Sequence, residues 1–525
     1  MRKILFAVNS IRAAAIILII TTTLSNILGV IRDHFLAQKI ASSQLDVYYA
    51  AFRLPDVIFN LLILGAVASA FIPIFTTVIH EEECSLVEET SGGEKPSWRL
   101  LNNLLTGATI FLLLAIVLMF ILMPLLMGWL VPNFSPDKQR QTIELARLML
   151  LSPLFFGLSY IFGGVLNCFQ RFLVYSLAPI IYNLAIIFGA VVLAEKWGVM
   201  GVGLMVVIGA FLHLAIQVPS VIQLGWRPRI IIDFADEKLR KIVELMLPRT
   251  IGLAANQIIL LFFTALASAW SGTIAYFSLA NNIQTVPTIV LGSSLATAIF
   301  PHLSKQAAQD NHAEFSHWLI KSFRYCLLLL LPATFLIIAL RIQIIRLLLG
   351  SGHFNWPATI ATANILGIMA LSLVATGTIP LLARGFWARQ DTKTPMWIAI
   401  FSMLIAVSTG WFLSAKYQIL GLAAAYSLAS LINGCLLYCF LRKKLTVKIN
   451  WLILSLMAKI LFACFLMTIV VQLVKGHIGA IVDMDRFWGV AVQFTAAAII
   501  GAITYIFALW LTGEKIRLKD EDIHP

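Results

Sequence analysis

Residues 24–75 read LSNILGVIRDHFLAQKIASSQLDVYYAAFRLPDVIFNLLILGAVASAFIPIF, and they place charged side chains between and within apolar segments. Among these are Arg32, Asp33, Asp46, Arg53 and Asp56. A charge at the centre of a bilayer costs about 2.5 kcal/mol or more, so such residues usually face a bundle interior or a water-filled cavity. The stretch therefore predicts the polar lining of a transport path. A short loop between two helices is an equally good interpretation for Arg32, Asp33 and Asp46, whereas Arg53 lies further into the apolar run.

The composition is that of a membrane protein built of many helices. The chain of 525 residues is 60% hydrophobic and 12% charged, with a mean hydropathy of +0.91. Windows of about 20 apolar residues, the length that crosses a bilayer as an α-helix, recur about fourteen times. They lie near 11–30, 47–79, 101–130, 143–167, 174–195, 200–222, 242–268, 273–301, 323–348, 358–383, 394–414, 419–440, 451–474 and 487–512. The sequence therefore predicts an all-α polytopic membrane protein with about 14 transmembrane helices.

The basic charge is distributed unevenly among the loops. The formal net charge is +13, and Lys and Arg cluster in alternate loops, for example at 227–241, 384–393 and 442–448. The loops between them carry only scattered cations, such as Lys416 and Lys475. Such an asymmetry marks the cytoplasmic side of a membrane protein. It predicts that both termini are cytoplasmic, and it explains the basic composition without a nucleic-acid partner.

The sequence has none of the usual motifs of a catalytic centre. It contains no Gly-x-x-x-x-Gly-Lys-Ser/Thr phosphate loop, no nucleophile elbow and no paired metal-ligand spacing. Its six cysteines are scattered, mostly within apolar segments. We therefore expect no enzyme activity, no metal and no cofactor. Without an ATP site, any transport is expected to be driven by a gradient, by the membrane potential or by the substrate itself.

Two stretches of the first half recur in the second half. One repeat aligns Pro73 with Pro301, an offset of 228 residues (301 − 73), and the other aligns Gln170 with Gln390, an offset of 220 (390 − 170). A copy with an even number of helices keeps its orientation in the membrane. The duplication therefore predicts two six-helix lobes related by a pseudo-twofold axis along the membrane normal, with a cavity between them. Chance similarity between apolar segments is the alternative.

The duplication divides the chain into four expected parts. They are an N-terminal lobe with helices 1–6 (residues 1–222), a cytoplasmic linker (223–241), a C-terminal lobe with helices 7–12 (242–441), and helices 13–14 with a cytoplasmic tail (442–525). The last two helices have few polar residues. Packing against the lobes and lining a groove for a lipid chain are both consistent with their composition.

Polar residues inside the apolar segments concentrate in the first two helices of each expected lobe. They include Asn26, Asn60, Asn256 and Asn282, together with Arg249. Helices in these positions would line a shared cavity. Arginines there suit a diphosphate, because the guanidinium fork donates paired hydrogen bonds to phosphate oxygens. For each Asn taken singly, a hydrogen bond between helices is the simpler role.

Five short motifs occur along the chain, each at one position. They are LGVIRD (28–33), DVYYAAFRLP (46–55), GAVASAFIPIF (65–75), MLPRTIGLAANQI (246–258) and GFWARQDTKTP (385–395). Together they resemble the MurJ (MviN) family of lipid II flippases, in the multidrug/oligosaccharidyl-lipid/polysaccharide exporter superfamily. The resemblance implies fourteen helices, a V-shaped pair of lobes and alternating access. The implied substrate is an undecaprenyl-diphosphate-linked disaccharide pentapeptide, moved from the cytoplasmic to the outer leaflet of a bacterial inner membrane for peptidoglycan synthesis.

The resemblance also leads us to expect roles for individual residues. The diphosphate would be held by Arg32, Arg53 and Arg249, with Asn26, Asn60, Asn256 and Asn282 beside them. The acids Asp33, Asp46 and Asp56 would orient those arginines or relay cations. Headgroups at the cytoplasmic mouth would meet Arg384, Arg389 and Lys393. The expected partners are an undecaprenyl-diphosphate-linked glycan lipid and membrane lipids, and the cell-wall synthesis machinery is a candidate protein partner.

The chain departs from the family pattern at several of these positions. Family members usually have Arg where this chain has Asn26, basic residues where it has Phe59 and Asn60, and Asp-Arg where it has Asn281 and Asn282. The acids that relatives use for a sodium site are also missing. These departures keep two alternatives open. One is a flippase for another polyprenyl-diphosphate-linked glycan or a cation-coupled exporter of the same superfamily; the other is a membrane scaffold that has lost transport.

Overall fold

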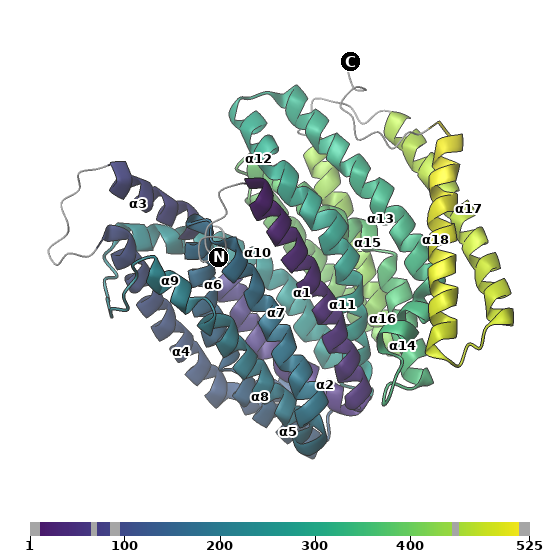
Figure 1. The fold of residues 1–525 in the computed structure, drawn as a ribbon, viewed down its shortest axis with the longest axis horizontal. Helices are drawn as coiled ribbons and strands as arrows, with labels where there is room; N and C mark the ends of the chain where they lie inside the picture. The colour runs from purple at the N-terminus through teal and green to yellow at the C-terminus, as the bar shows by residue number, and fades with distance from the viewer. Residues whose placement is uncertain (1–10, 65–70, 85–94, 444–450, 514–525) are drawn as a thin grey trace. The chain divides into compact units, whose positions relative to one another are not determined.

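The computed structural model describes residues 11–64, 71–84, 95–443 and 451–513 (Figure 1). Within these ranges, the side chains of 11–16, 18–19, 62–64, 83–84, 247–249, 251–253 and 451–454 are not described. The described residues form α-helices and short π-helical segments, and no strand occurs among them. The all-α fold class predicted from hydropathy is therefore confirmed.

The helices divide by their contacts into two compact units, Met1–Ala275 and Tyr276–Pro525. The first unit contains α1 (Ile11–Lys39), α2 (Ser42–Ile58), η1 (Phe59–Leu64), α3 (Ile72–Cys84), α4 (Pro96–Leu130), α5 (Pro136–Met149), α6 (Ser152–Cys168), α7 (Phe172–Phe188), η3 (Gly189–Leu193), α8 (Ala194–Ala215), α9 (Val218–Gln223), α10 (Glu237–Ala267) and the start of α11 (Thr273–Pro287). The second unit contains the rest of α11, η4 (Thr288–Ser293), α12 (Ser294–Ala308), α13 (His312–Leu349), α14 (Trp356–Ala370), α15 (Leu373–Ala388), α16 (Lys393–Arg442), α17 (Trp451–Ile481) and α18 (Phe487–Leu511).

In the first unit, α1 packs along α7, α7 packs along α8, and α2 packs along α5 (Figure 1). Helix α10 contacts α4, α2 and η1 of the same unit. The expected C-terminal lobe begins with α10, so the contacts divide the chain at a different place from the expected repeat. The lobe boundaries stay a prediction.

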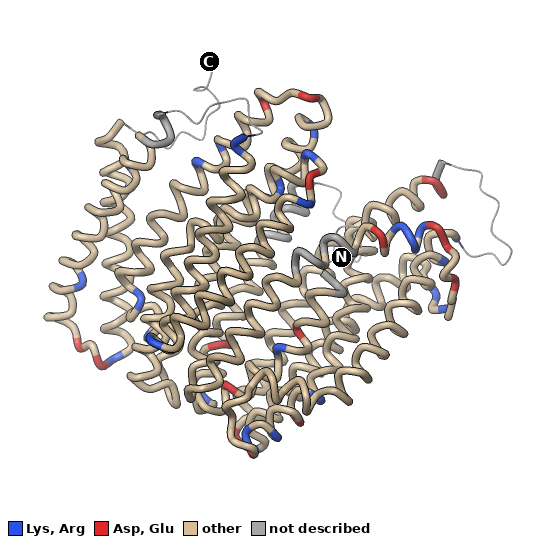
Figure 2. Tube along the Cα trace, turned by 180° about the vertical axis from the view of Figure 1, so that it is seen from behind, with Lys and Arg blue, Asp and Glu red and all other residues tan. Residues whose placement is uncertain are grey.

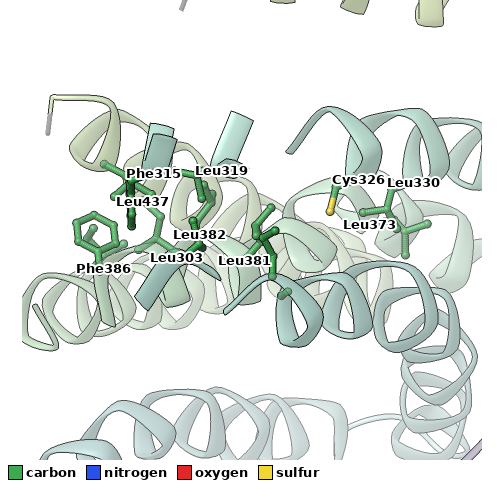
Figure 3. Packing of buried hydrophobic residues seen from close by; sticks show 14 residues of the cluster. Leu303, Phe315, Leu319, Cys326, Leu330, Leu373, Leu381, Leu382, Phe386 and Leu437 are labelled. Atoms are coloured by element: carbon green, nitrogen blue, oxygen red, sulfur yellow. The ribbon is translucent and has the colours of Figure 1, made fainter. Parts of the chain in front are cut away.

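In the second unit, two groups of buried apolar side chains hold the helices together. One joins α12, α13, α15 and α16 through residues such as Leu303, Phe315, Phe386 and Leu437 (Figure 3). The other joins α13 to α17 and α18, which lie side by side. Tyr505 of α18 strengthens that contact, because its hydroxyl donates to the backbone oxygen of Leu328 at 2.8 Å. In a bilayer such contacts stabilise through close packing and hydrogen bonds, since lipid tails are as apolar as the helices.

Eight of the described helical runs are long and apolar enough to cross a membrane, and the bent pair Trp356–Ala370 and Leu373–Ala388 brings the total to nine. Two of these runs, Phe172–Gln223 with 52 residues and Lys393–Arg442 with 50, each contain two of the predicted segments. A helix of 50 residues would be about 75 Å long, whereas the apolar core of a bilayer is about 30 Å thick. Each run therefore has the length of two crossings. The total of about 14 crossings stays a prediction.

Both long runs break at equivalent positions. Gly198 has φ 55° and ψ −142°, and Gln418 has φ 51° and ψ −132°. These residues are 220 apart (418 − 198), which is the offset of the second sequence repeat. The pair that defines that repeat, Gln170 and Gln390, also shares a positive φ, of 56° and 58°. The recurrence of unusual backbone angles at one offset supports the duplication of these helices.

Charged and apolar side chains are distributed as lipid contact requires. In each unit the Lys, Arg, Asp and Glu residues gather mainly toward the ends of the helices (Figure 2). Large apolar side chains are exposed between those ends, for example Leu114 and Ile121 of α4, each 64% exposed. An apolar surface of this kind marks contact with a membrane or a partner.

One close approach in the second unit depends on glycine. A Cβ atom added to Gly292 in η4 would lie 2.2 Å from the carbonyl oxygen of Gly377 in α15. Two backbones approach this closely only where side chains are absent, as is common between membrane helices. Gly292 is therefore needed for the packing of η4 against α15.

Candidate functional site

Arg32 is oriented by side chains from two helices of the first unit. Its Nε and Nη2 donate to Asp33 Oδ1 at 3.0 and 2.8 Å, and its Nη1 donates to Asn183 Oδ1 of α7 at 3.1 Å. Asn183 donates in turn to the backbone oxygen of Ser25 at 3.2 Å. The side chain of Arg32 is 22% exposed and that of Asp33 is 7% exposed. The guanidinium is therefore held by three hydrogen bonds, and part of the Arg32 side chain stays accessible.

Arg53 lies on α2 at the contact with α10. Its Nε donates to Thr264 Oγ1 at 3.0 Å. Asp56, one turn further along α2, interacts electrostatically with both Arg53 and Arg32. These two arginines, with Asp33 and Asp56, form a group of two cations and two anions, which we call the arginine cluster. Each charge has an opposite charge near it, as buried charges require.

A tyrosine hydroxyl beside the arginine cluster has no hydrogen-bond partner in the described part of the chain. Tyr48 and Tyr49 of α2 and Tyr182 of α7 all interact electrostatically with Arg32. The hydroxyl of Tyr49 is buried, and no described residue accepts from it or donates to it. An unsatisfied buried hydroxyl costs about 1–3 kcal/mol. An oxygen of a bound ligand would satisfy it, so this hydroxyl is consistent with a polar ligand next to the arginine cluster.

Asp46 is fully buried where α2, α5 and the start of α11 meet. Its Oδ2 accepts from Lys138 Nζ at 3.1 Å and from the backbone nitrogen of Gly272 at 2.6 Å, and its Oδ1 accepts from the backbone nitrogen of Ala275 at 3.0 Å. The first backbone N–H groups of a helix carry partial positive charge. The carboxylate therefore compensates both a lysine and a helix N-terminus, and it ties α11 to α2 and α5. We call this arrangement the Asp46 node.

The remaining predicted binding residues are spread over both units. Asn60 in η1 donates from Nδ2 to the backbone oxygen of Asp56 at 2.9 Å, so its amide is used within its own turn. Asn26 is half-buried on α1, Asn256 is exposed on α10, and Asn282 is half-buried on α11. The side chain of Arg249 lies outside the described residues. Of the three predicted diphosphate-binding arginines, the structure thus brings Arg32 and Arg53 together.

The residues predicted for the cytoplasmic mouth lie in the second unit. Arg384 on α15 donates to the backbone oxygen of Ser293 at 3.2 Å. The guanidinium of Arg389 lies 5.7 Å from the ring centroid of Phe315 and lines a cavity of about 470 Å³. Lys393 is exposed at the start of α16. Arg389 thus lines a space large enough for a polar headgroup.

Sequence reasoning missed the partners that hold these charges. Asn183 lies 151 residues from Arg32, and its only signal is a single amide in an apolar run. Lys138 counts in the sequence only as a charge in a loop, and Thr264 carries no signal at all. Among the described residues, no group of three or more His, Cys, Asp or Glu side chains is placed to hold a metal ion.

Comparison with known proteins connects this geometry to a family. The sequence profile described as "Lipid II flippase MurJ" matches residues 40–489. A protein of Rickettsia prowazekii named "Probable lipid II flippase MurJ" is 28% identical over 468 residues, which are 88% of this chain and 90% of that protein. A protein of Rhizobium meliloti with the same name is 30% identical over 434 residues, which are 79% of this chain and 77% of that protein.

Solved structures share the fold. The structure titled "Lipid II flippase MurJ, inward closed conformation" matches with a TM-score of 0.77 and 22% identity, and the match covers 96% of this chain and 100% of that one. An inward-facing multidrug resistance MATE family transporter of the MOP superfamily matches with a TM-score of 0.67 and 13% identity, over 81% of this chain and 98% of that one. At these identities the structures show the fold alone. The sequence profile covers most of the chain, and on that ground this protein belongs to the lipid II flippase MurJ family.

Proposed function

We propose that this protein is a flippase that moves lipid II, the lipid-linked peptidoglycan precursor, from the cytoplasmic to the outer leaflet by alternating access. Its family membership and the names of its relatives support this proposal. As a family member with many apolar helices, the chain is a multi-pass inner-membrane protein. The uneven distribution of Lys and Arg supports an orientation with both termini in the cytoplasm.

The observation that carries the proposed mechanism is the arginine cluster. Two guanidinium groups are retained within largely apolar segments, although a cation at the bilayer centre costs about 2.5–3.5 kcal/mol. Arg32 is partly accessible and already oriented, so it loses little conformational freedom when it binds. Phosphate oxygens would accept from Arg32 and Arg53 in place of part of their present contacts. The unsatisfied hydroxyl of Tyr49 would donate to the same ligand.

The carboxylates of the cluster have a matching role in the proposal. Asp33 and Asp56 balance the arginines when no substrate is bound, and they compete with the diphosphate when it is bound. Competition of this kind weakens binding and favours release on the other side, which a transporter requires at every cycle. Arg384, Arg389 and Lys393 would meet the headgroup earlier, at the cytoplasmic mouth.

A complementation assay tests the proposal. Cells depleted of their own lipid II flippase would express this chain or the double variant Arg32→Ala, Arg53→Ala. We expect the unchanged chain to restore growth and the double variant to fail, with both present in the membrane at equal amounts. Arg140→Ala is the matched control, because Arg140 is 82% exposed and its ion pair among the described residues is with Glu144 on its own helix.

The outcomes separate the proposal from its alternatives. Full rescue by the double variant would show that Arg32 and Arg53 are not needed for transport. It would refute the arginine mechanism but not the flippase activity. No rescue by the unchanged chain, with retained binding of a different polyprenyl-diphosphate lipid, would point to another glycan. No rescue and no bound lipid would favour a scaffold without transport.

A further inference from the structure

A second cavity of about 470 Å³ lies in the second unit, where the end of α13 meets the turn between α17 and α18. Its lining includes Gln343, Arg346, Trp356, Lys475, Gly479 and Gln493. We call it the α13–α17 cavity. None of its lining residues belongs to the arginine cluster, the Asp46 node or the cavity at Arg389, so the proposed transport path does not account for it.

The α13–α17 cavity has an excess of positive charge. The carboxylate nearest to Arg346 is that of Asp485, at 3.9 Å and on a side chain that is 99% exposed, and an ion pair so open to water contributes little. Lys475 donates from Nζ to a backbone oxygen of α13 at 3.2 Å, and no described carboxylate pairs with it. Arg341 also lies close enough to Lys475 to repel it. An anion in the cavity would relieve this repulsion.

A chain of amides fixes a hydrogen-bond acceptor at the same place. Gln493 donates from Nε2 to the backbone oxygen of Lys475 at 2.7 Å, and its Oε1 accepts from Gln343 Nε2 at 2.9 Å. Because a backbone oxygen can only accept, the orientation of both amides is determined. The Oε1 atom of Gln343 is thereby left buried with no donor among the described residues. A ligand with a hydroxyl group would supply that donor.

The surroundings of the cavity place it at the level of lipid headgroups. The apolar runs His312–Leu349 and Ser455–Ile481 end beside it. Trp356 is 53% exposed, and Trp488, at the start of α18, is 76% exposed. Exposed tryptophans at the ends of spans lie at the membrane–water interface, where their amphipathic rings sit among the headgroups.

We propose that the α13–α17 cavity binds the glycerol phosphate headgroup of an anionic phospholipid. The phosphate lies between Arg346 and Lys475, and a glycerol hydroxyl donates to Gln343 Oε1. The lipid comes from the leaflet at the Phe487 end of α18, opposite the end at Leu511. The volume suits one headgroup and is too small for a disaccharide with a pentapeptide. The inference does not depend on the proposed transport activity.

Lipid titrations on the purified full-length chain test this proposal. The delipidated protein in detergent would be titrated with phosphatidylglycerol, with zwitterionic phosphatidylcholine, and with phosphatidylethanol, which keeps the anionic phosphodiester but lacks the headgroup hydroxyls. Native mass spectrometry counts the bound lipids. We expect one phosphatidylglycerol site that binds about tenfold or more tightly than phosphatidylcholine, with phosphatidylethanol between them. Equal binding of phosphatidylglycerol and phosphatidylcholine by the unchanged protein would overturn the proposal.

Variants then locate the site. Arg346→Gln with Lys475→Gln should reduce phosphatidylglycerol binding to the level of phosphatidylcholine. Arg486→Gln is the matched control, because Arg486 is 81% exposed, pairs with Asp483 and does not line the cavity. Gln343→Leu should remove the preference for phosphatidylglycerol over phosphatidylethanol and leave the preference for an anionic lipid.

Two further results would contradict the assignment. One is a double variant that keeps its thermal unfolding transition and still selects phosphatidylglycerol. The other is free glycerol phosphate binding at the same residues with no competition from phosphatidylglycerol, which would assign the cavity to a soluble anion.

Discussion

The Asp46 node offers the sharpest test of the structure, through Asp46→Asn. The substitution keeps the shape of the side chain and removes its charge. Three donors now point at the carboxylate, namely the ammonium of Lys138 and the backbone N–H groups of Gly272 and Ala275. An amide has only one oxygen, so its NH2 group would face at least one of those donors. Lys138, whose side chain is only 19% exposed, would lose its counter-charge.

The expected loss of stability follows from these contacts. Breaking a buried ion pair by removing one partner costs about 3–5 kcal/mol. The low end applies here, because Lys138 keeps some access to water and lies 3.9 Å from the ring centroid of Phe134, a favourable contact for a cation. Loss of the interaction with the N-terminus of α11 adds about 0.3–1 kcal/mol. We therefore expect Asp46→Asn to lower the free energy of unfolding by about 3–4 kcal/mol.

Unfolding in mixed micelles with increasing dodecyl sulfate, followed by tryptophan fluorescence, measures this difference. Asp137→Asn is the matched control, because Asp137 is an exposed acid on the same helix as Lys138 and should cost less than about 1 kcal/mol. The double variant Asp46→Asn, Lys138→Met should cost clearly less than the sum of the two single variants, because the two side chains interact directly. Additive losses, or an Asp46→Asn loss equal to that of the control, would refute the assignment of the node.

Other parts of the molecule give predictions of the same kind. Arg32→Lys keeps the charge but loses the guanidinium fork whose separate nitrogens bond Asp33 and Asn183, so we expect impaired complementation with unchanged expression. Asp56→Asn removes an anion from the arginine cluster and should increase retention of anionic polyprenyl lipid about tenfold in native mass spectra, whereas weaker retention would contradict the proposed competition. Gly292→Ala should destabilise the protein by about 2 kcal/mol or more, while Gly107→Ala, with no atom near its new Cβ, should be neutral or slightly stabilising. Gln170→Gly should stabilise by about 1 kcal/mol in the same unfolding assay, because glycine adopts its φ of 56° without strain.

The helical architecture could be predicted from the sequence because lipid permits so few alternatives. Only helices and closed barrels satisfy their own backbone hydrogen bonds in a bilayer, and the apolar runs are far too long for barrel strands. The breaks in the two long helical runs could also be predicted, since the gaps between predicted apolar segments at 196–199 and 415–418 contain Gly198 and Gln418. The lengths of the helical runs give a smaller count of crossings than hydropathy does, because two of the runs continue through those breaks.

The candidate site was only partly predictable. Sequence patterns selected Arg32, Asp33, Arg53 and Asp56, because charges inside apolar runs are rare, and the structure places these four close together. The same patterns placed Asp46 with them, whereas the structure gives it a separate set of partners on α5 and α11. Those partners depend on helix packing over 92 to 229 residues of sequence. No local pattern carries that information, so such partners become visible only in the folded chain.

The charge balance of the arginine cluster has a consequence for the whole transport cycle. The formal charges of Arg32 and Arg53 are matched by those of Asp33 and Asp56, so the formal charge of the cluster is zero. A diphosphate brings about two negative charges, and binding it there leaves them uncompensated unless further cations approach or a carboxylate takes up a proton. The family arginines that this chain lacks at Asn26 and Asn282 would have supplied such cations. Under the proposed function, the missing charge has to come from groups outside the cluster. Binding of the diphosphate would then draw those groups toward the cluster, so that the step that recognises the substrate also drives the change of access.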